Sequence, residues 1–568
     1  MAESRAEDRT RDRAVKAPED DAPRRRRAFV TRISLVGIVL GGLFCATTFT
    51  PSLIPRPWGA QGVLAGCALA TGYGVGTALG GIWRFLEAPL PNIRQHRVLV
   101  WILLAAMVVL LTVSLLYARD WQNETLVLMG LPEAEDGFFL RILALGGVVA
   151  AVLILLGWGL VAGLRMAARY PLRFAPRRFL SLFGVLLFLV LLLTTLNDTV
   201  ISGAISFIDE VQMAADVSDP PGVRPPEEAG RSGSPESLIA WDDLGHAGKL
   251  FVHEGPDAAE IARLTGRPAQ EPIRVYAGLR SADDNRARAE LVLEELKRTG
   301  AFERSVLVIA TPTGTGWLDD AGIAPLEYLH GGDTAVAGVQ YSYLASPQSL
   351  ILEPGRAQGS ASEVFDVIYG YWSALAPDSR PRLYLFGLSL GSYGSESSPM
   401  MYAYVRNPIS GAVWAGPTFR NALWRRIIEN RDDGSPAWAP VFETGTLIRV
   451  LSPGGRIDRS PDSWGPLRIA YVANPSDAIV FFREDMWLYR PAWMDDPRGP
   501  DVSPLLRWVP VVTFLQVAMD MLLAASVPPG HGHTYAARDY LQAWRAVTQP
   551  EDWTDQDTDG LIRHMAGR

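Results

Sequence analysis

Five charge-free apolar stretches fill most of the first two hundred residues, and they constrain the fold more than any other feature of the chain. A helix needs roughly 20 apolar residues to cross the ~30 Å hydrocarbon layer, and a chain in lipid must pair its backbone N–H and C=O groups internally. The pattern therefore predicts an α-helical transmembrane domain over 33–215 with about five spans. The stretches are 33–55, 57–83, 98–118, 142–164 and 179–197.

The arginines between these stretches predict an orientation. Five arginines lie close before the first stretch, one follows the first stretch, three follow the second, two follow the third and five follow the fourth. Arginine-rich segments thus alternate with arginine-poor ones. The positive-inside rule then places the N-terminus in the cytoplasm and everything after residue 200 outside it. The polar segment 1–32 is expected to be a disordered tail. A signal peptide would also begin with basic residues, but several more apolar runs follow this one.

The second stretch is rich in small residues, among them Gly72, Gly74 and Gly76. Small residues let two helices approach closely in a membrane. We therefore expect this stretch to form a packed face of the helical domain.

Composition excludes several classes of protein. Charged residues make up 20% of the 568 residues, below the ~25% that is typical of soluble domains, which agrees with a membrane part. The net charge of −8 disfavours a nucleic-acid binder, since that class normally needs a basic surface. The only cysteines, Cys45 and Cys67, lie in apolar stretches, so the rest of the chain has no cysteine nucleophile or cysteine zinc site.

After the membrane domain the composition changes twice. Residues 216–237 are rich in Pro, Gly, Ser and Glu, which predicts an extended linker. Residues 238–550 then alternate short apolar runs with helical patterns, which predicts an α/β domain with a doubly wound parallel sheet. Residues 551–568 form a polar tail, and 238–568 is expected to fold without the membrane half. The predicted strands lie at 273–277, 306–310, 336–343, 383–386, 411–415, 446–451 and 468–473.

The motif Gly-x-Ser-x-Gly at 387–391 is the strongest sign of chemistry. It begins where the apolar strand 383–386 stops, and a helix-like stretch follows it. Such a strand-turn-helix elbow needs the two glycines, because side chains there would clash in the tight turn. The motif predicts that Ser389 is a nucleophile held out at the carboxyl end of the sheet. A flexible Gly/Ser-rich loop is the alternative reading.

The base and the acid of a catalytic triad should follow the serine in the order Ser, acid, His. His531 and His533 lie in a Gly/Pro-rich loop, and Gly-x-Gly-His is the spacing that favours His533 as the base, with His531 as the alternative. Asp477 follows the strand at 468–473 and is the expected acid, although it could instead cap the next helix. No third histidine lies near the His-x-His pair, so no metal is expected, and nothing indicates a cofactor.

An oxyanion hole needs two backbone N–H groups. The first should belong to Leu390, directly after the nucleophile. The second is expected from the loop after the strand at 306–310, where we predict Thr313 and Gly314. A phosphate-binding loop is disfavoured here, because the lysine of that motif is missing.

These motifs together resemble those of a bacterial family of membrane-anchored α/β-hydrolases with a multi-helix N-terminal transmembrane domain. The matching residues are 274–279, 298–302, 311–317, 340–344, 387–391 and 530–535. The resemblance implies a sheet of α/β-hydrolase type and hydrolase chemistry, and it does not identify the substrate. One departure is Leu388, which stands where a Glu is expected in related sequences.

The sequence thus predicts a membrane-anchored serine hydrolase, either an esterase or lipase or an acyltransferase. Its expected partners are the membrane and a lipid or another acyl ester, which Ser389 would attack at the outer face of the membrane. The rival hypothesis is a non-catalytic membrane scaffold or transport accessory that uses the hydrolase fold only for binding. The presence of Ser389, Asp477 and His533 in the right order favours the enzyme.

Overall fold

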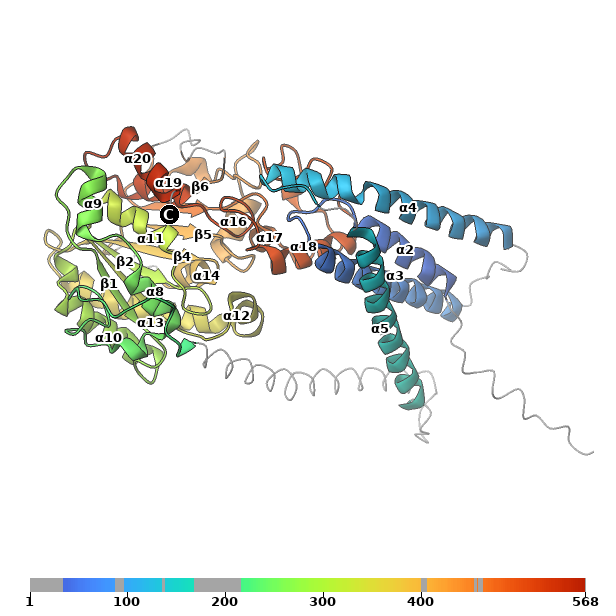
Figure 1. Cartoon of the computed structure of the whole chain (residues 1–568), viewed down its shortest axis with the longest axis horizontal. Coiled ribbons are helices and arrows are strands. Elements are labelled where there is room, and N and C mark those ends of the chain that lie inside the picture. Colours follow the sequence, from blue (N-terminus) through green and yellow to red (C-terminus); the bar gives the residue numbers. More distant parts are fainter. Residues whose placement is uncertain are drawn as a thin grey trace, which may run out of the picture.

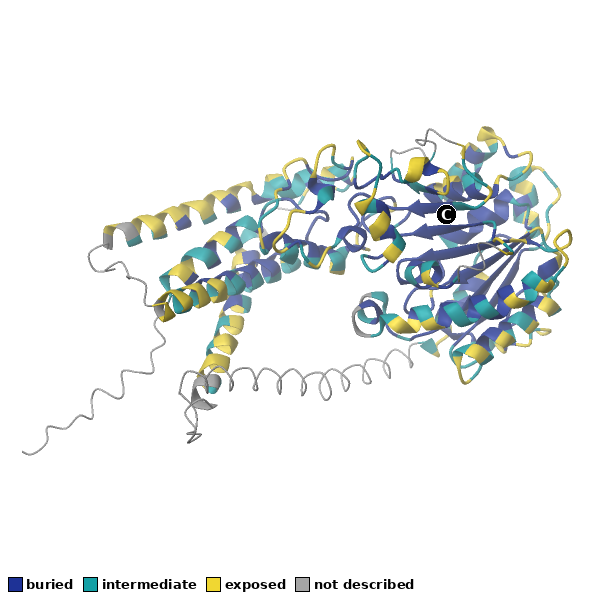
Figure 2. Cartoon of the chain, turned by 180° about the vertical axis from the view of Figure 1, so that it is seen from behind, coloured by how far each residue is buried: buried dark blue, intermediate teal, exposed yellow. Residues whose placement is uncertain are grey.

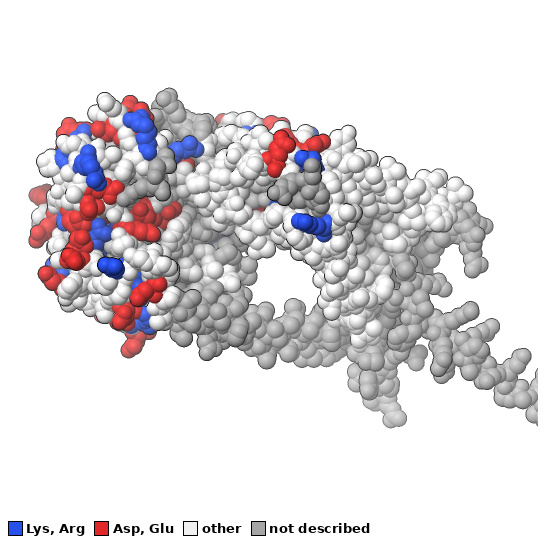
Figure 3. All heavy atoms as spheres, viewed as in Figure 1, with Lys and Arg blue, Asp and Glu red and all other residues white. Residues whose placement is uncertain are grey.

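A computed structural model of the whole chain describes residues 34–86, 97–134, 138–167, 216–399, 406–453, 457 and 463–566. It consists of a helical N-terminal part and a larger α/β part, which lie end to end and share an interface (Figure 1). Charged side chains gather over the α/β part, whereas the visible surface of the N-terminal helices is almost free of them (Figure 3). This separation is the one predicted from composition.

Three helices of the N-terminal part are long and apolar enough to cross a membrane: α3 (Trp58–Phe85), α4 (Arg97–Leu128) and α5 (Phe138–Ala167). They correspond to the second, third and fourth predicted spans. Long stretches of α4 and α5 expose apolar side chains (Figure 2). Such exposure is costly in water and favourable in lipid. The fifth predicted stretch, 179–197, lies outside the described residues.

The prediction that 33–55 forms one span is wrong. Its helix, α2 (Leu35–Thr47), has 13 residues, or about 20 Å at 1.5 Å per residue, which is short of the hydrocarbon thickness. Pro51 and Pro55 explain the early end, because proline lacks an N–H group and disfavours helical backbone before it. The chain continues through 51–57 without helix or strand and is mostly buried there.

Gly72 and Gly76 of α3 pack as expected against α2, whereas Gly74 faces open space. A Cβ atom on Gly72 would lie 2.6 Å from the carbonyl oxygen of Leu40, and one on Gly76 would lie 2.6 Å from that of Val36. The two helices run antiparallel, and their backbones come too close at these points for any side chain.

The α/β part is built on seven parallel strands, which confirms the predicted sheet. The order across the sheet is β1-β3-β2-β4-β5-β7-β6, so the chain winds outward in two directions from its middle. The strands are buried along almost their whole length (Figure 2), as expected for a sheet covered on both faces. They are β1 (Ile273–Ala277), β2 (Val306–Thr311), β3 (Thr334–Val339), β4 (Arg382–Leu388), β5 (Gly411–Ala415), β6 (Ile448–Leu451) and β7 (Arg468–Val472).

Helices cover both faces of the sheet, with α10 and α13 on one side and α11 and α19 on the other (Figure 1). The helices of this part are α8 (Gly245–His253), α9 (Ala258–Thr265), α10 (Asn285–Arg298), α11 (Asp320–Leu329), α12 (Ser346–Leu352), α13 (Pro354–Ala374), α14 (Leu390–Ser397), α16 (Ala422–Glu429), α17 (Ala478–Phe481), α18 (Val512–Leu523), α19 (Ala537–Thr548) and α20 (Asp555–Ala566). Short 3-10 helices are η3 (Trp241–Asp243), η4 (Ala301–Glu303), η5 (Glu443–Gly445) and η6 (Ala492–Met494).

Two segments expected to be free of the domain pack against it. In the predicted linker, Ser232 donates its N–H to the carbonyl of Arg274 at 3.0 Å, and Arg274 donates its N–H to Gly230 at 3.0 Å. The edge strand β1 has unpaired backbone groups, which this stretch of the linker covers. In the predicted polar tail, α20 buries Leu561, and His564 lies 2.9 Å from Glu260. Charge composition alone does not show this amphipathic pattern.

Candidate active site

Ser389 lies in a sharp turn between β4 and α14, as the motif predicts. Its backbone has φ 57° and ψ −123°, a left-handed conformation that is strained for a residue with a side chain. Its N–H group donates to the carbonyl of Ala415 on the neighbouring strand at 3.0 Å. These values describe an elbow that holds the serine at the carboxyl edge of the sheet, and they argue against a flexible loop.

The two glycines of the motif have the role expected of them. A Cβ atom on Gly387 would lie 2.5 Å from the backbone of Gly391. A Cβ atom on Gly391 would lie 2.2 Å from the carbonyl oxygen of Thr311, at the end of β2. Either contact would push the turn open, so glycine is required at both positions for steric reasons.

Asp477 follows β7 and is completely buried. Its Oδ1 accepts hydrogen bonds from the N–H groups of Ile479 at 2.9 Å and Val480 at 3.3 Å, which caps α17. Its Oδ2 lies 2.6 Å from Nδ1 of His533. Asp477 therefore has both of the roles considered from the sequence. Its Oδ1 caps the helix, and its Oδ2 faces the imidazole.

The ring of His533 lies beside the elbow. A Cβ atom on Gly416 would be 2.7 Å from Cε1 of the ring, and Gly416 directly follows Ala415, which accepts the N–H of Ser389. The other ring nitrogen, Nε2, is buried and has no hydrogen-bond partner within the described part of the chain. The geometry thus brings Asp477 and His533 together, and Nε2 of the imidazole makes no hydrogen bond to Ser389 or to any other described residue.

His531, the alternative base, faces a different carboxylate. Its Nδ1 lies 3.1 Å from Oδ2 of Asp501, and that oxygen also accepts a hydrogen bond from the hydroxyl of Ser476 at 2.5 Å. Between the two histidines, Gly532 donates its N–H to the hydroxyl of Ser476 at 2.8 Å. The loop therefore separates the two imidazoles, and His533 is the one paired with Asp477.

The sequence did not single out Tyr535 as a site residue. Its hydroxyl donates to Oδ2 of Asp477 at 2.6 Å, the same oxygen that faces His533, and its ring packs edge-on against the imidazole. Burial keeps the pKa of Tyr535 well above its ordinary value, so the hydroxyl remains a donor. In the sequence, only the position of Tyr535, two residues after the expected base His533, could have indicated a role at the site.

The predicted oxyanion hole is only partly supported. Leu390 is the first residue of α14, so its N–H has no acceptor within the helix. However, the N–H of Thr313 donates to the carbonyl of Trp317 at 2.9 Å, and that of Gly314 donates to the hydroxyl of Ser346 at 3.0 Å. Both groups are thus used inside their loop, and the second oxyanion donor predicted there has no support from this geometry.

An apolar pocket of about 280 Å³ opens beside Ser389. Phe419, Ile479 and Phe482 form part of its wall, and α18 contributes Ala518, Met521 and Leu522. The apolar composition of α18 does not by itself show which face turns toward the serine. The size and lining of this pocket suit a hydrocarbon chain.

Comparison with known families agrees with this geometry. Residues 273–561, just over half of the chain, match the α/β-hydrolase family. Residues 49–256 match the N-terminal region of the same family. No curated protein and no solved structure matches the chain. On the extent of these matches, the chain belongs to the α/β-hydrolase family and carries the N-terminal region of that family.

Proposed function

We propose that the protein is a serine hydrolase, an esterase, lipase or acyltransferase, that acts on acyl esters at the outer face of the membrane. The observation that carries the proposal is the arrangement of three side chains. Ser389 lies on a strained elbow, and the imidazole of His533 lies beside it with Nδ1 held 2.6 Å from Asp477. The non-catalytic scaffold remains the rival hypothesis.

In the proposed reaction, Nε2 of His533 takes the proton of the Ser389 hydroxyl as the oxygen attacks the ester carbonyl. The carbonyl oxygen becomes an oxyanion, to which the N–H of Leu390 would donate. The imidazolium then returns the proton to the leaving alcohol. Water, or a second alcohol in an acyltransferase, releases the acyl group from Ser389 by the same steps. Asp477 holds the imidazole in place and stabilises the imidazolium.

The apolar lining of the pocket supports acyl esters as the substrate class. Most of its lining is hydrocarbon, so a fatty chain would gain roughly 0.8 kcal/mol for each buried CH₂ group. Chain length should therefore affect KM. Among the residues that the structure describes, no charged side chain lines this pocket, which disfavours a charged group on the acyl side of the substrate.

The packing of the helices supports an extracytoplasmic active site. The α/β part meets the chain where α2 ends and α3 begins, and also near the end of α4 (Figure 1). The opposite helix ends lead into the segments that carry most of the arginines, among them Arg84, Arg94 and Arg97. By the positive-inside rule those ends are cytoplasmic, and the α/β part lies outside.

Two experiments test the proposal. Purified full-length protein is screened with p-nitrophenyl esters of increasing chain length, alongside Ser389→Ala. We expect turnover that depends on chain length and disappears in the variant, and equal activity of the two proteins would support the scaffold. A periplasmic-type reporter fused after residue 215 should be active only outside the cytoplasm. Activity of a cytoplasmic reporter at the same position would reverse the topology.

A further inference from the structure

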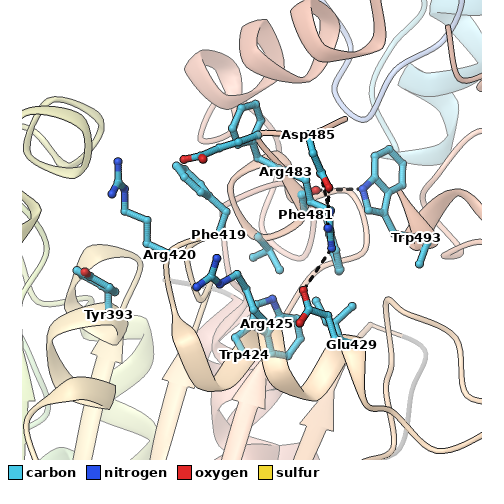
Figure 4. A pocket seen from close by; sticks show the side chains of 15 residues that line it. Tyr393, Phe419, Arg420, Trp424, Arg425, Glu429, Phe481, Arg483, Asp485 and Trp493 are labelled. Atoms are coloured by element: carbon cyan, nitrogen blue, oxygen red, sulfur yellow. Dashed lines mark hydrogen bonds and ion pairs between the residues drawn. The ribbon is translucent and has the colours of Figure 1, made fainter. Parts of the chain in front are cut away.

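A second, larger pocket of about 530 Å³ adjoins the apolar pocket of Ser389. The two share Phe419 and Phe482, whose rings pack edge to face with centroids 5.0 Å apart and so form a common wall. Tyr393, one helical turn after Ser389 on α14, also lines the second pocket. The second pocket therefore adjoins the apolar one, and Figure 4 shows the side chains that line it.

Three arginines and three carboxylates line this arginine pocket, but their charges are not paired evenly. Arg483 lies 2.9 Å from Asp485 and 3.6 Å from Glu429, so one guanidinium neighbours two carboxylates. Arg420 and Arg425 make no ion pair with any other residue that the structure describes. Two guanidinium groups and the carboxylate of Glu484 thus line the pocket without an ion-pair partner among the described residues, and Figure 4 shows both guanidinium groups apart from the bonded group around Arg483.

Two N–H groups at the pocket are buried and have no acceptor among the residues that the structure describes. They are Nε of Arg420 and Nε1 of Trp424, and the Trp424 side chain is completely buried in the floor. An N–H group buried without an acceptor is costly and rare in folded proteins, so each such group needs an explanation. Here both belong to side chains that line one pocket, which points to a ligand rich in acceptor oxygens.

We propose that the arginine pocket binds a phosphate or carboxylate group, and that this group belongs to the alcohol part of the ester substrate. This inference rests on the proposed function. Guanidinium groups bind such oxyanions through paired hydrogen bonds, and the indole N–H of Trp424 would add a third donor. An ester held at Ser389 has an acyl side and an alcohol side. The apolar pocket takes the first, and the arginine pocket takes the second.

The test compares two esters with the same acyl chain on full-length protein. The decanoyl ester of glycerol 3-phosphate carries the anion, and the decanoyl ester of glycerol does not. Arg420→Gln and Arg425→Gln should each lower kcat/KM for the phosphate ester about tenfold and leave the glycerol ester unchanged. Arg426→Gln is the matched control, because Arg426 is exposed on α16 like its neighbour Arg425 but does not line the pocket. Equal effects on both esters, or none, would overturn the proposal.

A binding measurement separates this proposal from the proposed function. Hexyl phosphate and inorganic phosphate are titrated calorimetrically into the full chain in a nonionic detergent. We expect hexyl phosphate to bind, and Trp424→Phe, which removes the N–H donor together with part of the ring, should weaken that binding. A neutral fluorophosphonate should still label Ser389 in this variant. Equally tight binding of inorganic phosphate would contradict a lipid-type ligand, and no binding of either would refute the site. Loss of labelling in the wild type would refute the hydrolase instead.

Discussion

Arg56 and Asp520 form a buried ion pair, with 2.8 Å between Nε and Oδ1, that joins the helical part to the α/β part. Their side chains are 3% and 0% exposed. The other carboxylate oxygen of Asp520 accepts hydrogen bonds from the hydroxyl of Ser52 and from the N–H of Leu53 at 3.1 Å. Asp520 lies on α18, the helix that lines the apolar pocket. The N-terminal helical part thus holds one wall of the candidate active site in place.

The first prediction concerns this pair. Asp520→Asn should lower the free energy of unfolding of the full chain by roughly 3–5 kcal/mol, because it leaves the charge of Arg56 buried and unpaired. Thermal unfolding in detergent measures the effect. Asp485→Asn is the control, since its pair with Arg483 is 2.9 Å long but half exposed, and its loss should cost about 1 kcal/mol or less. Similar losses in the two variants would mean that the interface contributes little.

The same interface supports the loop that carries the candidate base. Leu53 and Ile54 belong to the hydrophobic core of the α/β part. A Cβ atom on Gly532 would lie 3.0 Å from Ile54, and the neighbouring His533 donates its N–H to the carbonyl of Ala524 at the end of α18. Residues from the N-terminal half therefore pack directly beneath the histidine loop.

A second prediction follows for the isolated fragment 238–568. The sequence suggested that it folds alone, but the buried positions of Leu53 and Ile54 argue that it does not. We expect the fragment to aggregate or to unfold without a cooperative transition, since removal of the N-terminal half takes Leu53 and Ile54 out of its core and leaves the charge of Asp520 without Arg56. A soluble fragment with a sharp calorimetric transition and full reaction with a fluorophosphonate would contradict this expectation.

The difference between sequence and structure here has a physical cause. Strands, elbow and the order Ser389, Asp477, His533 can be predicted because each depends on local patterns: apolar runs, tight-turn glycines and loop residues. The interface depends on the ion pair between Arg56 and Asp520, which are 464 positions apart in the sequence. The local sequence pattern around either residue does not predict this contact. The packing of the predicted linker against β1 could not be predicted for the same reason. Its Pro-rich composition does not indicate the backbone hydrogen bonds that it forms with Arg274.

Tyr535 gives a third prediction. Tyr535→Phe removes the hydroxyl that bonds Asp477 and keeps the ring that packs on His533, so kcat should fall about tenfold with KM little changed. The carboxylate then has one donor fewer and holds the imidazolium more strongly. The acidic limb of the pH–rate profile should therefore move to higher pH. A lower kcat with an unmoved profile would indicate only a structural role for the tyrosine.

A fourth prediction concerns pH and stability. Burial raises the pKa of Asp319, in the loop before α11, to about 7. Between about pH 4 and 7 the folded chain then binds more protons at this site than the unfolded chain, so its stability falls as pH rises. Asp319→Asn, which can keep the bond to Tyr540, should be about 2 kcal/mol more stable than the wild type at pH 8. Asp378→Asn, at an exposed site, should leave the free energy of unfolding unchanged. Unfolding scans of both variants and the wild type at pH 5 and pH 8 measure the difference.

The candidate triad gives the last prediction. The central claim is that Ser389, His533 and Asp477 act together, and the rate at which a fluorophosphonate labels the full-length protein tests it most directly. Labelling should map to Ser389 and disappear in Ser389→Ala. It should fall to near background in His533→Ala and by roughly 10³–10⁴-fold in Asp477→Asn, but only slightly in His531→Ala. Labelling that persists in Ser389→Ala, or depends on His531 and not on His533, would contradict the account.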